Sequence, residues 1–353
     1  MSDPLNPFEQ LENNEENFLK YKDAGTIATK AMNRLVKLAK PGKSMSELIK
    51  LGNETVLEEL GKVHTDIKDK GLAFPICLSV NEIVGNYLPG PTEILKEGDL
   101  LKIELGVQID GFPSLICFTT LVTSDTTIKI DDKRANVLKA CIEASREVAK
   151  IMKPGTLNTE IVKVMEKAAI KYGCTLPISN EPGLIPGVLS CQISRYIIDS
   201  HNDDDYKGEF IHRFILSREN SVLDLFMAEL PLEENEVYAI DIVMCSGSGK
   251  LVKSHETSIY RKNDEKREEL KLKASRQVLN SLKGLYPKSI DLKDLNNKIG
   301  LKECLNKNVV IAYPVLSEKT GEFVCRIKFT IIVRPKPVLL CGKQADQELT
   351  KLS

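Results

Sequence analysis

The sequence predicts an α+β fold built from two similar halves that share one sheet. A helix that ends at Lys-Pro-Gly and is followed by a second helix occurs at residues 38–47 and again at 151–160. An acidic turn that leads into a strand ending in Ile and a carboxylate occurs at 95–104 and again at 232–241. Because both patterns repeat in the same order, each half should contain two helices followed by strands.

The first half opens with two helices. Apolar residues recur at helical spacing over residues 24–38, and Lys-Pro-Gly at 40–42 ends that helix. Ser44 or Ser46 can cap the next helix, whose apolar face extends over 45–60.

The second half repeats this arrangement. A helical stripe covers residues 137–151 and stops at Lys-Pro-Gly, 153–155. Thr156 or Thr159 can cap the following helix, whose apolar residues run over 161–169.

Charged side chains interrupt the strands that should lie at the centre of the sheet. Residues 101–109 alternate between an apolar face and a polar face, and so do residues 323–333, while Asp241 interrupts an apolar run at 237–244. An acid in such a run is costly to bury and needs a partner. The pattern leaves two interpretations open, a site between the halves or an ordinary polar face. The polar faces comprise Lys102, Glu104, Gly106 and Gln108 on one strand and Arg326, Lys328 and Thr330 on the other.

Composition excludes several protein classes. The chain has 353 residues, of which 42% are hydrophobic, so a sizeable core is expected. Its nine cysteines include no Cys-x-x-Cys pair, which favours free thiols over disulfides or a zinc site and indicates a reducing compartment, the cytoplasm. The first ten residues lack the layout of a signal peptide, and no apolar stretch is long enough for a membrane span.

Several motifs resemble those of type 2 methionine aminopeptidases. That resemblance implies the pita-bread fold, in which two pseudo-symmetric α+β halves surround a dinuclear metal site, with a helical insert matching residues 261–307. It extends over nearly the whole chain, from about Phe18 to Leu352. The motifs are Gly71-Leu-Ala-Phe-Pro75 with its continuation to Asn81, residues 95–106 with 110–112, residues 236–241 and residues 329–335.

A closer resemblance is to the proliferation-associated, or ErbB-receptor-binding, protein family, a non-peptidase branch. It implies loss of aminopeptidase activity, RNA binding, and roles in ribosome biogenesis, translation and growth control. The partners that it implies are the RNA of the large ribosomal subunit and the proteins near the tunnel exit, with other RNA or protein partners as further ones. The cytoplasm would be the main location, with the nucleus and nucleolus as further ones. The matching segments are residues 20–22, 71–75, 95–99, 106–112, 321–323 and 328–330.

The resemblance also places the aminopeptidase's functional residues on this chain. The five metal ligands, two Asp, one His and two Glu, fall on Glu104, Leu115, Cys191, Asp241 and Lys328, and the substrate-side His falls on Asn86.

Two of these positions are chemically unsuited to a metal. Leu115 cannot ligate, and the Lys328 ammonium has no acceptor and would repel divalent ions. We therefore predict that Lys328 occupies the metal's place and pairs with Glu104 and Asp241, and that the protein uses no cofactor and has no catalytic residues.

Three other motifs carry weaker signals. His-Asn-Asp-Asp-Asp at 201–205 has no ligand spacing and is typical of a solvated loop. The Gly-rich segment 246–250 lacks the spacing of a phosphate-binding loop. Cys191 has no histidine nearby in sequence, so a buried thiol is favoured over a nucleophile.

The segment 261–307 is the best candidate for a binding surface. It should form helices at 270–282 and 292–305, and its 13 basic and 7 acidic residues give it a net charge of +6, whereas the rest of the chain carries −7. Phosphate contacts by such residues give affinity without sequence readout, although interleaved acids also fit a merely solvated face. The candidate residues for ribosomal RNA are Lys262, Lys266, Arg267, Lys271, Lys273, Arg276 and Lys283.

The predicted organisation has four parts. They are an acidic flexible arm at 1–17, the main domain at 18–260 and 308–345, the basic helical insert at 261–307, and a tail at 346–353 that lacks the lysine-rich end implied by the resemblance. Two alternatives remain besides the ribosome-binding hypothesis, a transcriptional or signalling adaptor without ribosome contact and a divergent methionine aminopeptidase.

Overall fold

A computed structural model describes residues 11, 14–125, 127, 129–179, 190–199, 214–216, 229–264 and 266–342. Helix α1 begins at Glu15, and Leu11 is buried, so the boundary predicted at residue 18 lies too far along the chain. The rest of the predicted arm, the His-Asn-Asp-Asp-Asp motif at 201–205 and the 346–353 tail lie outside the described residues.

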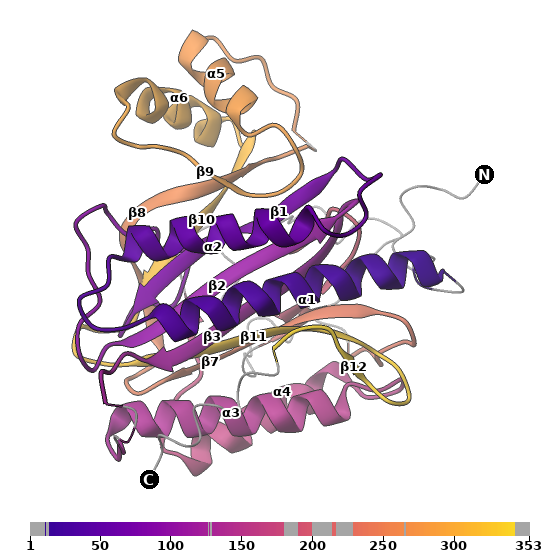
Figure 1. The fold of residues 1–353 in the computed structure, drawn as a ribbon, viewed down its shortest axis with the longest axis vertical. Coiled ribbons are helices and arrows are strands. Elements are labelled where there is room, and N and C mark those ends of the chain that lie inside the picture. The colour runs from indigo at the N-terminus through magenta and orange to yellow at the C-terminus, as the bar shows by residue number, and fades with distance from the viewer. Residues whose placement is uncertain are drawn as a thin grey trace.

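Both halves have the predicted order of helices before strands (Figure 1). The first half consists of α1 (Glu15–Leu38), α2 (Met45–Leu60), β1 (Lys70–Val80), β2 (Leu100–Ile109) and β3 (Phe112–Leu121). The second consists of α3 (Lys133–Ile151), α4 (Asn158–Lys171), β4 (Ile178–Ser179), β5 (Ser190–Ile193), β6 (Phe214–Ile215) and β7 (Val237–Cys245), to which β11 (Val324–Ile332) and β12 (Val338–Leu339) add later in the chain.

The main sheet joins the two halves edge to edge. Its strand order is β1-β2-β3-β11-β7-β5-β6, and the halves meet where β3 pairs with β11. Alternate residues of these strands pack against helices α1 to α4 in one large core, as the predicted alternation requires. The opposite face is also buried, because β8 and β10 and the chain around them cover it.

One predicted cap is wrong. Ser44 caps α2 as expected, but the residue that precedes α4 is Leu157, whose side chain forms no capping hydrogen bond. The backbone around Thr156 pairs instead with the chain at Leu230 and Leu232, and the Asn158 carboxamide oxygen accepts from Leu230. A hydrogen bond to a distant part of the chain thus pairs a backbone N–H at the start of α4, where a capping side chain would otherwise accept.

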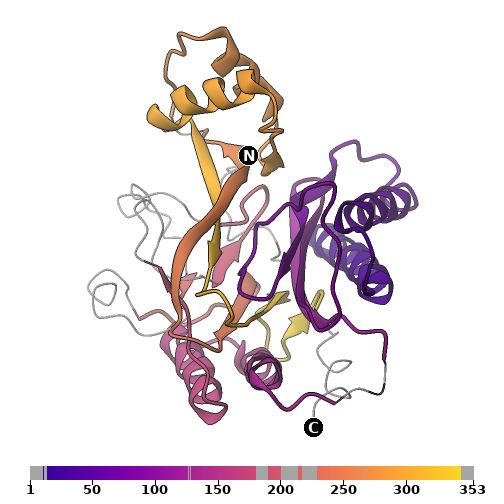
Figure 2. The same cartoon turned by 90° about the vertical axis from the view of Figure 1, so that its left-hand side faces the viewer.

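The insert projects from the body on two long strands (Figure 2). β8 (Lys250–Lys262) pairs antiparallel with β10 (Val310–Ser317), while α5 (Lys273–Ser281), β9 (Lys288–Ser289) and α6 (Leu295–Asn306) lie between them in the chain. The two helices stand where the sequence predicts them, over shorter ranges, and share a small core of their own. The sequence did not reveal β10, in which Pro314 coincides with a register irregularity.

Candidate functional site

A row of side chains crosses the centre of the main sheet. The strand registers place Cys77 opposite Glu104, Glu104 opposite Cys117, Cys117 opposite Lys328, and Lys328 opposite Asp241. Because directly opposite residues project to the same face, all five lie on the face turned away from the four main helices. Strand periodicity adds Arg326, two residues before Lys328.

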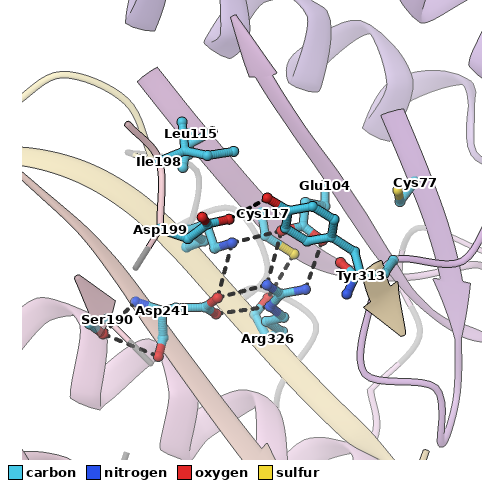
Figure 3. Close-up of polar contacts among 12 residues, drawn as sticks. Cys77, Glu104, Leu115, Cys117, Ser190, Ile198, Asp199, Asp241, Tyr313 and Arg326 are labelled. Carbon is cyan, nitrogen blue, oxygen red and sulfur yellow. Dashed lines mark hydrogen bonds and ion pairs between the residues drawn. The ribbon is translucent and has the colours of Figure 1, made fainter. Parts of the chain in front are cut away.

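Four of these side chains form a closed ionic cluster, called here the buried quartet: Glu104, Asp241, Arg326 and Lys328. Arg326 donates through Nη1 and Nη2 to the two oxygens of Glu104, at 2.7 and 2.9 Å, and through Nε and Nη2 to those of Asp241, at 2.8 and 2.7 Å (Figure 3). Lys328 Nζ lies 2.7 Å from Glu104 Oε1 and 3.1 Å from Asp241 Oδ2. Every carboxylate oxygen therefore has a cationic donor, and the formal charges cancel.

The environment keeps Asp241, Arg326 and Lys328 ionised. Burial by itself would raise the pKa of Asp241, but the charges of Arg326 and Lys328 outweigh it and lower this pKa below its ordinary value. Burial likewise disfavours the charged forms of Arg326 and Lys328, yet the two carboxylates raise both pKa values. Charge pairing rather than solvent thus stabilises these buried ions.

These residues do not fit a divalent metal centre. A metal would have to compete with an arginine and a lysine for all four carboxylate oxygens. Leu115 is buried and offers no ligand, and burial raises the pKa of Cys191 to about 12, so its thiol stays protonated and donates to the Ile198 carbonyl. Within the described part of the chain, no three His, Cys, Asp or Glu side chains gather as a metal site would require.

The pairing of Lys328 with both acids was anticipated from the sequence, whereas the part played by Arg326 was missed. Two signals could have found it. Arg326 stands two residues before Lys328 on the same predicted strand face. Two acids with only one lysine would also leave a net negative charge in the core, which demands a second cation.

The loop after β1 closes over the quartet. Gly85 lies so close that a Cβ atom there would stand 2.0 Å from Arg326 Nη1 and 3.2 Å from Glu104 Oε2. The neighbouring Asn86 has a φ of 61°, and its side-chain amide donates to the Pro314 carbonyl at 3.0 Å. Asn86 thus ties this loop to β10.

Gly85→Ala is expected to destabilise the protein by about 1–3 kcal/mol, because the new methyl group overlaps the guanidinium and pushes Arg326 out of its two bidentate contacts. Urea denaturation measures the effect. Gly71→Ala is the matched control, since a Cβ atom there meets nothing within 4 Å. Equal midpoints for the two variants would contradict the tight packing inferred at Gly85.

A second buried lysine lies on the same strand face as Glu104. Lys102 is 1% exposed, and its Nζ donates to three backbone carbonyls, those of Asn81 at 2.6 Å, Val324 at 3.0 Å and Leu100 at 3.2 Å. These bonds join the turn after β1 to the beginnings of β2 and β11. Burial lowers the pKa of Lys102 to about 7.

The depressed pKa of Lys102 predicts a pH-dependent stability. An unfolded lysine titrates near 10.4, so between about pH 7 and 10.4 the unfolded chain binds more protons than the folded protein. The free energy of unfolding should therefore rise with pH in this window, by up to roughly 1.4 kcal/mol per pH unit from this residue. Urea denaturation of the wild type and Lys102→Met at pH 7.5 and 9.5 tests it. A difference between the two proteins that is the same at both pH values would contradict the assignment.

The two strands of the insert are anchored beside the quartet. Tyr313 of β10 donates to Asp199 Oδ2 at 2.6 Å, and Arg261 of β8 contacts Asp199 Oδ1 at 3.0 Å. Arg261 Nε also donates to the Tyr313 hydroxyl at 3.1 Å. Figure 3 shows Asp199 and Tyr313 beside Glu104 and Asp241, so the base of the insert is built into the wall of this site.

The basic candidates of the insert have unequal surroundings. Lys262 pairs with Asp264, and the Arg276 guanidinium donates to the Leu270 and Lys271 carbonyls. Lys266 is exposed, and like Lys262 and Arg276 it interacts with another residue. The remaining candidates, Arg267, Lys271, Lys273 and Lys283, are exposed, and their side chains form no ion pair with the described residues.

Comparison with known proteins agrees with this architecture. The model of metallopeptidase family M24 matches residues 20–240. ERBB-3 binding protein 1 of Arabidopsis thaliana is 32% identical over 94% of this chain and 81% of its own length. A curved DNA-binding protein of Schizosaccharomyces pombe is 32% identical over 95% of this chain and 85% of its own.

A solved structure supports the fold assignment. The structure of a thermophilic Arx1 has a TM-score of 0.80 and 23% identity, covering 96% of this chain and 94% of that one. The pita-bread fold expected from the sequence is thus confirmed. The chain belongs to metallopeptidase family M24, among relatives of the ERBB-3-binding type.

Proposed function

We propose that this chain is a catalytically inactive member of family M24 that binds the large ribosomal subunit near its tunnel exit and contacts ribosomal RNA through the basic insert. The observation that carries the loss of activity is the buried quartet. It fills the centre of the fold with an arginine and a lysine where a peptidase of this family would hold its metals.

Energetics support this interpretation of the quartet. Admitting a divalent ion would require Arg326 and Lys328 to leave both carboxylates, and two stranded buried cations would cost several kcal/mol each. Arg326 is fully engaged by two bidentate contacts from different strands, so its displacement would also disturb the sheet. The positions aligned with ligands, Glu104, Leu115, Cys191, Asp241 and Lys328, together with Asn86, are accordingly proposed to be a degenerate metal site.

The insert supports the binding part of the proposal. It stands away from an acidic body on two strands and presents exposed basic side chains at Arg267, Lys271, Lys273 and Lys283. Phosphate groups are the natural partners of such residues. Two of the similar proteins also carry names that denote binding, one to ERBB-3 and one to curved DNA.

Sedimentation and a peptidase assay test the proposal. The protein should co-migrate with large ribosomal subunits at low salt and dissociate as salt rises, because phosphate contacts release counterions. It should show no turnover of Met-initiated peptides with added cobalt or manganese. Turnover under these conditions would establish the divergent aminopeptidase instead.

A signalling adaptor without ribosome contact is the second candidate function, favoured by the similarity to ERBB-3 binding protein 1. Failure to co-migrate with large subunits at low salt would select this alternative. The ribosome-binding proposal places the protein in the cytoplasm, with passage through the nucleus and nucleolus during ribosome biogenesis, and fluorescence microscopy of a tagged chain checks this location.

A further inference from the structure

The ammonium group of Lys102 lies among three backbone carbonyl oxygens, called here the carbonyl cage. They belong to Asn81, Leu100 and Val324, and Nζ donates to them at 2.6, 3.2 and 3.0 Å. The three come from separate segments, namely the turn after β1, the beginning of β2 and the beginning of β11. Converging backbone carbonyls are also the groups with which proteins replace the hydration shell of a potassium ion.

The carbonyl cage is held by hydrogen bonds in which Lys102 takes no part. Asn81 has a φ of 50°, its N–H donates to the Leu100 carbonyl at 2.9 Å, and its carbonyl accepts from the Val324 N–H at 3.0 Å. Its side-chain carboxamide accepts from the Leu100 N–H at 2.9 Å and donates to Asp99 at 3.0 Å. The backbone therefore fixes the three carbonyls relative to one another, whatever group lies between them.

A fourth oxygen stands on the neighbouring strand. Ser79 is directly opposite Lys102 in the register of β1 and β2, so the two side chains project to the same face of the sheet. The serine is 1% exposed, and its Oγ has no hydrogen-bond partner among the described residues. The three N–H donors of Lys102 are directed to the carbonyls, whereas a spherical ion binds oxygens from any direction and could also accept Ser79 Oγ as a ligand.

The chemistry of the cage selects a single positive charge. Each of the three oxygens carries only the partial negative charge of a carbonyl dipole, which attracts a cation and repels an anion. A buried ion without a carboxylate ligand costs free energy, and this cost rises steeply with the charge of the ion, so a divalent metal is disfavoured. Ammonium and potassium ions are close in size, and the same oxygens can therefore surround either of them.

We propose that the carbonyl cage and Ser79 Oγ form a site for a monovalent cation of the size of potassium, and that Lys102 fills this site as a tethered ion. The lysine joins the turn after β1 to the beginnings of β2 and β11, one strand from each half, and this junction then needs no free ion from solution. The inference concerns the body of the protein and does not depend on the proposed ribosome binding.

Thermal unfolding of the Lys102→Ala variant in different salts tests the proposal. The substitution removes an ammonium and three methylene groups, which together have the structure of n-propylammonium. At pH 6, where Lys102 is charged, the variant should melt at least about 2 °C higher in potassium chloride, and in n-propylammonium chloride, than in choline chloride of equal concentration, because choline is too large for the cage. The wild type should melt at one temperature in all three salts, since its own ammonium occupies the site.

Lys102→Met is the matched control. Its side chain keeps the length of the lysine stem without the ammonium and leaves no room for an ion, so its melting temperature should not depend on the cation. The double variant Lys102→Ala/Ser79→Ala should respond to potassium less than Lys102→Ala does, because one ligand is lost.

Two results would overturn the proposal. One is a folded Lys102→Ala variant that melts at the same temperature in all three salts, and the other is an equal response to potassium in the Met and Ala variants. If Lys102→Ala is unfolded in choline chloride, circular dichroism decides: a folded spectrum restored by potassium or n-propylammonium supports the cation site, and failure of both to restore it contradicts the site.

Discussion

Arg326→Met is expected to lower the free energy of unfolding by about 3–5 kcal/mol, because it leaves two buried carboxylates with Lys328 as their single cation. The substitution removes the bidentate pairs with Glu104 and Asp241, in which all three side chains are less than a tenth exposed. Urea denaturation followed by circular dichroism measures the change.

Lys133→Met is the control for Arg326→Met. Its ammonium pairs with Glu322 but is 56% exposed, so its removal should cost no more than about 1 kcal/mol. The double variant Arg326→Met/Asp241→Asn should cost less than the sum of its two single variants, because it removes one cation together with one anion. If Arg326→Met proved no more harmful than Lys133→Met, or if the double variant were strictly additive, the quartet would not be the coupled unit described here.

Reversing three charges on the insert, Lys271→Glu/Lys273→Glu/Lys283→Glu, is expected to weaken binding to large ribosomal subunits by at least about tenfold at low salt. Each phosphate group that the variant no longer neutralises should also reduce the slope of log affinity against log salt by about 0.9 or somewhat less. Sedimentation across a salt series measures both quantities. Arg276 is left intact, because its guanidinium holds the backbone of the insert.

Lys50→Glu/Lys163→Glu/Lys167→Glu provides the matched control. It changes the net charge by the same amount at exposed lysines of α2 and α4, which belong to the body rather than the insert (Figure 1). Its affinity and salt slope should stay near those of the wild type. An equal decrease in affinity in both triple variants would mean that net charge alone, and not the insert, drives the association.

The two regions addressed by these experiments are physically connected. Arg261 and Tyr313, at the base of the insert, both contact Asp199 in the wall of the central site. The base of the projecting insert is thus held by hydrogen bonds and an ion pair at the wall of the site in which Arg326 and Lys328 neutralise Glu104 and Asp241.

Much of this organisation could be predicted from local sequence patterns. The repeated helix-Pro-Gly-helix junctions and the repeated acidic turns indicated two equivalent halves, and they placed Glu104 and Asp241 at matching positions. The identity of Lys328 was enough to predict that it pairs with these acids, since an ammonium has no lone pair to offer a metal. Such inferences depend only on residue chemistry and on spacings within single elements.

Other features required the tertiary structure. Arg326 joins the quartet because the register of β11 sets it near residues that are 85 and 222 positions away in the chain. At the start of α4 the backbone N–H of Asn158 donates to the Leu230 carbonyl, and neither Thr156 nor Thr159 caps the helix. Strand β10 forms because β8 lies beside it. The spacing of apolar residues within a segment predicts whether that segment is a helix or a strand. Which distant segment lies next to it depends on packing and on strand register. The partner of a buried charge is therefore known only once the chain is folded.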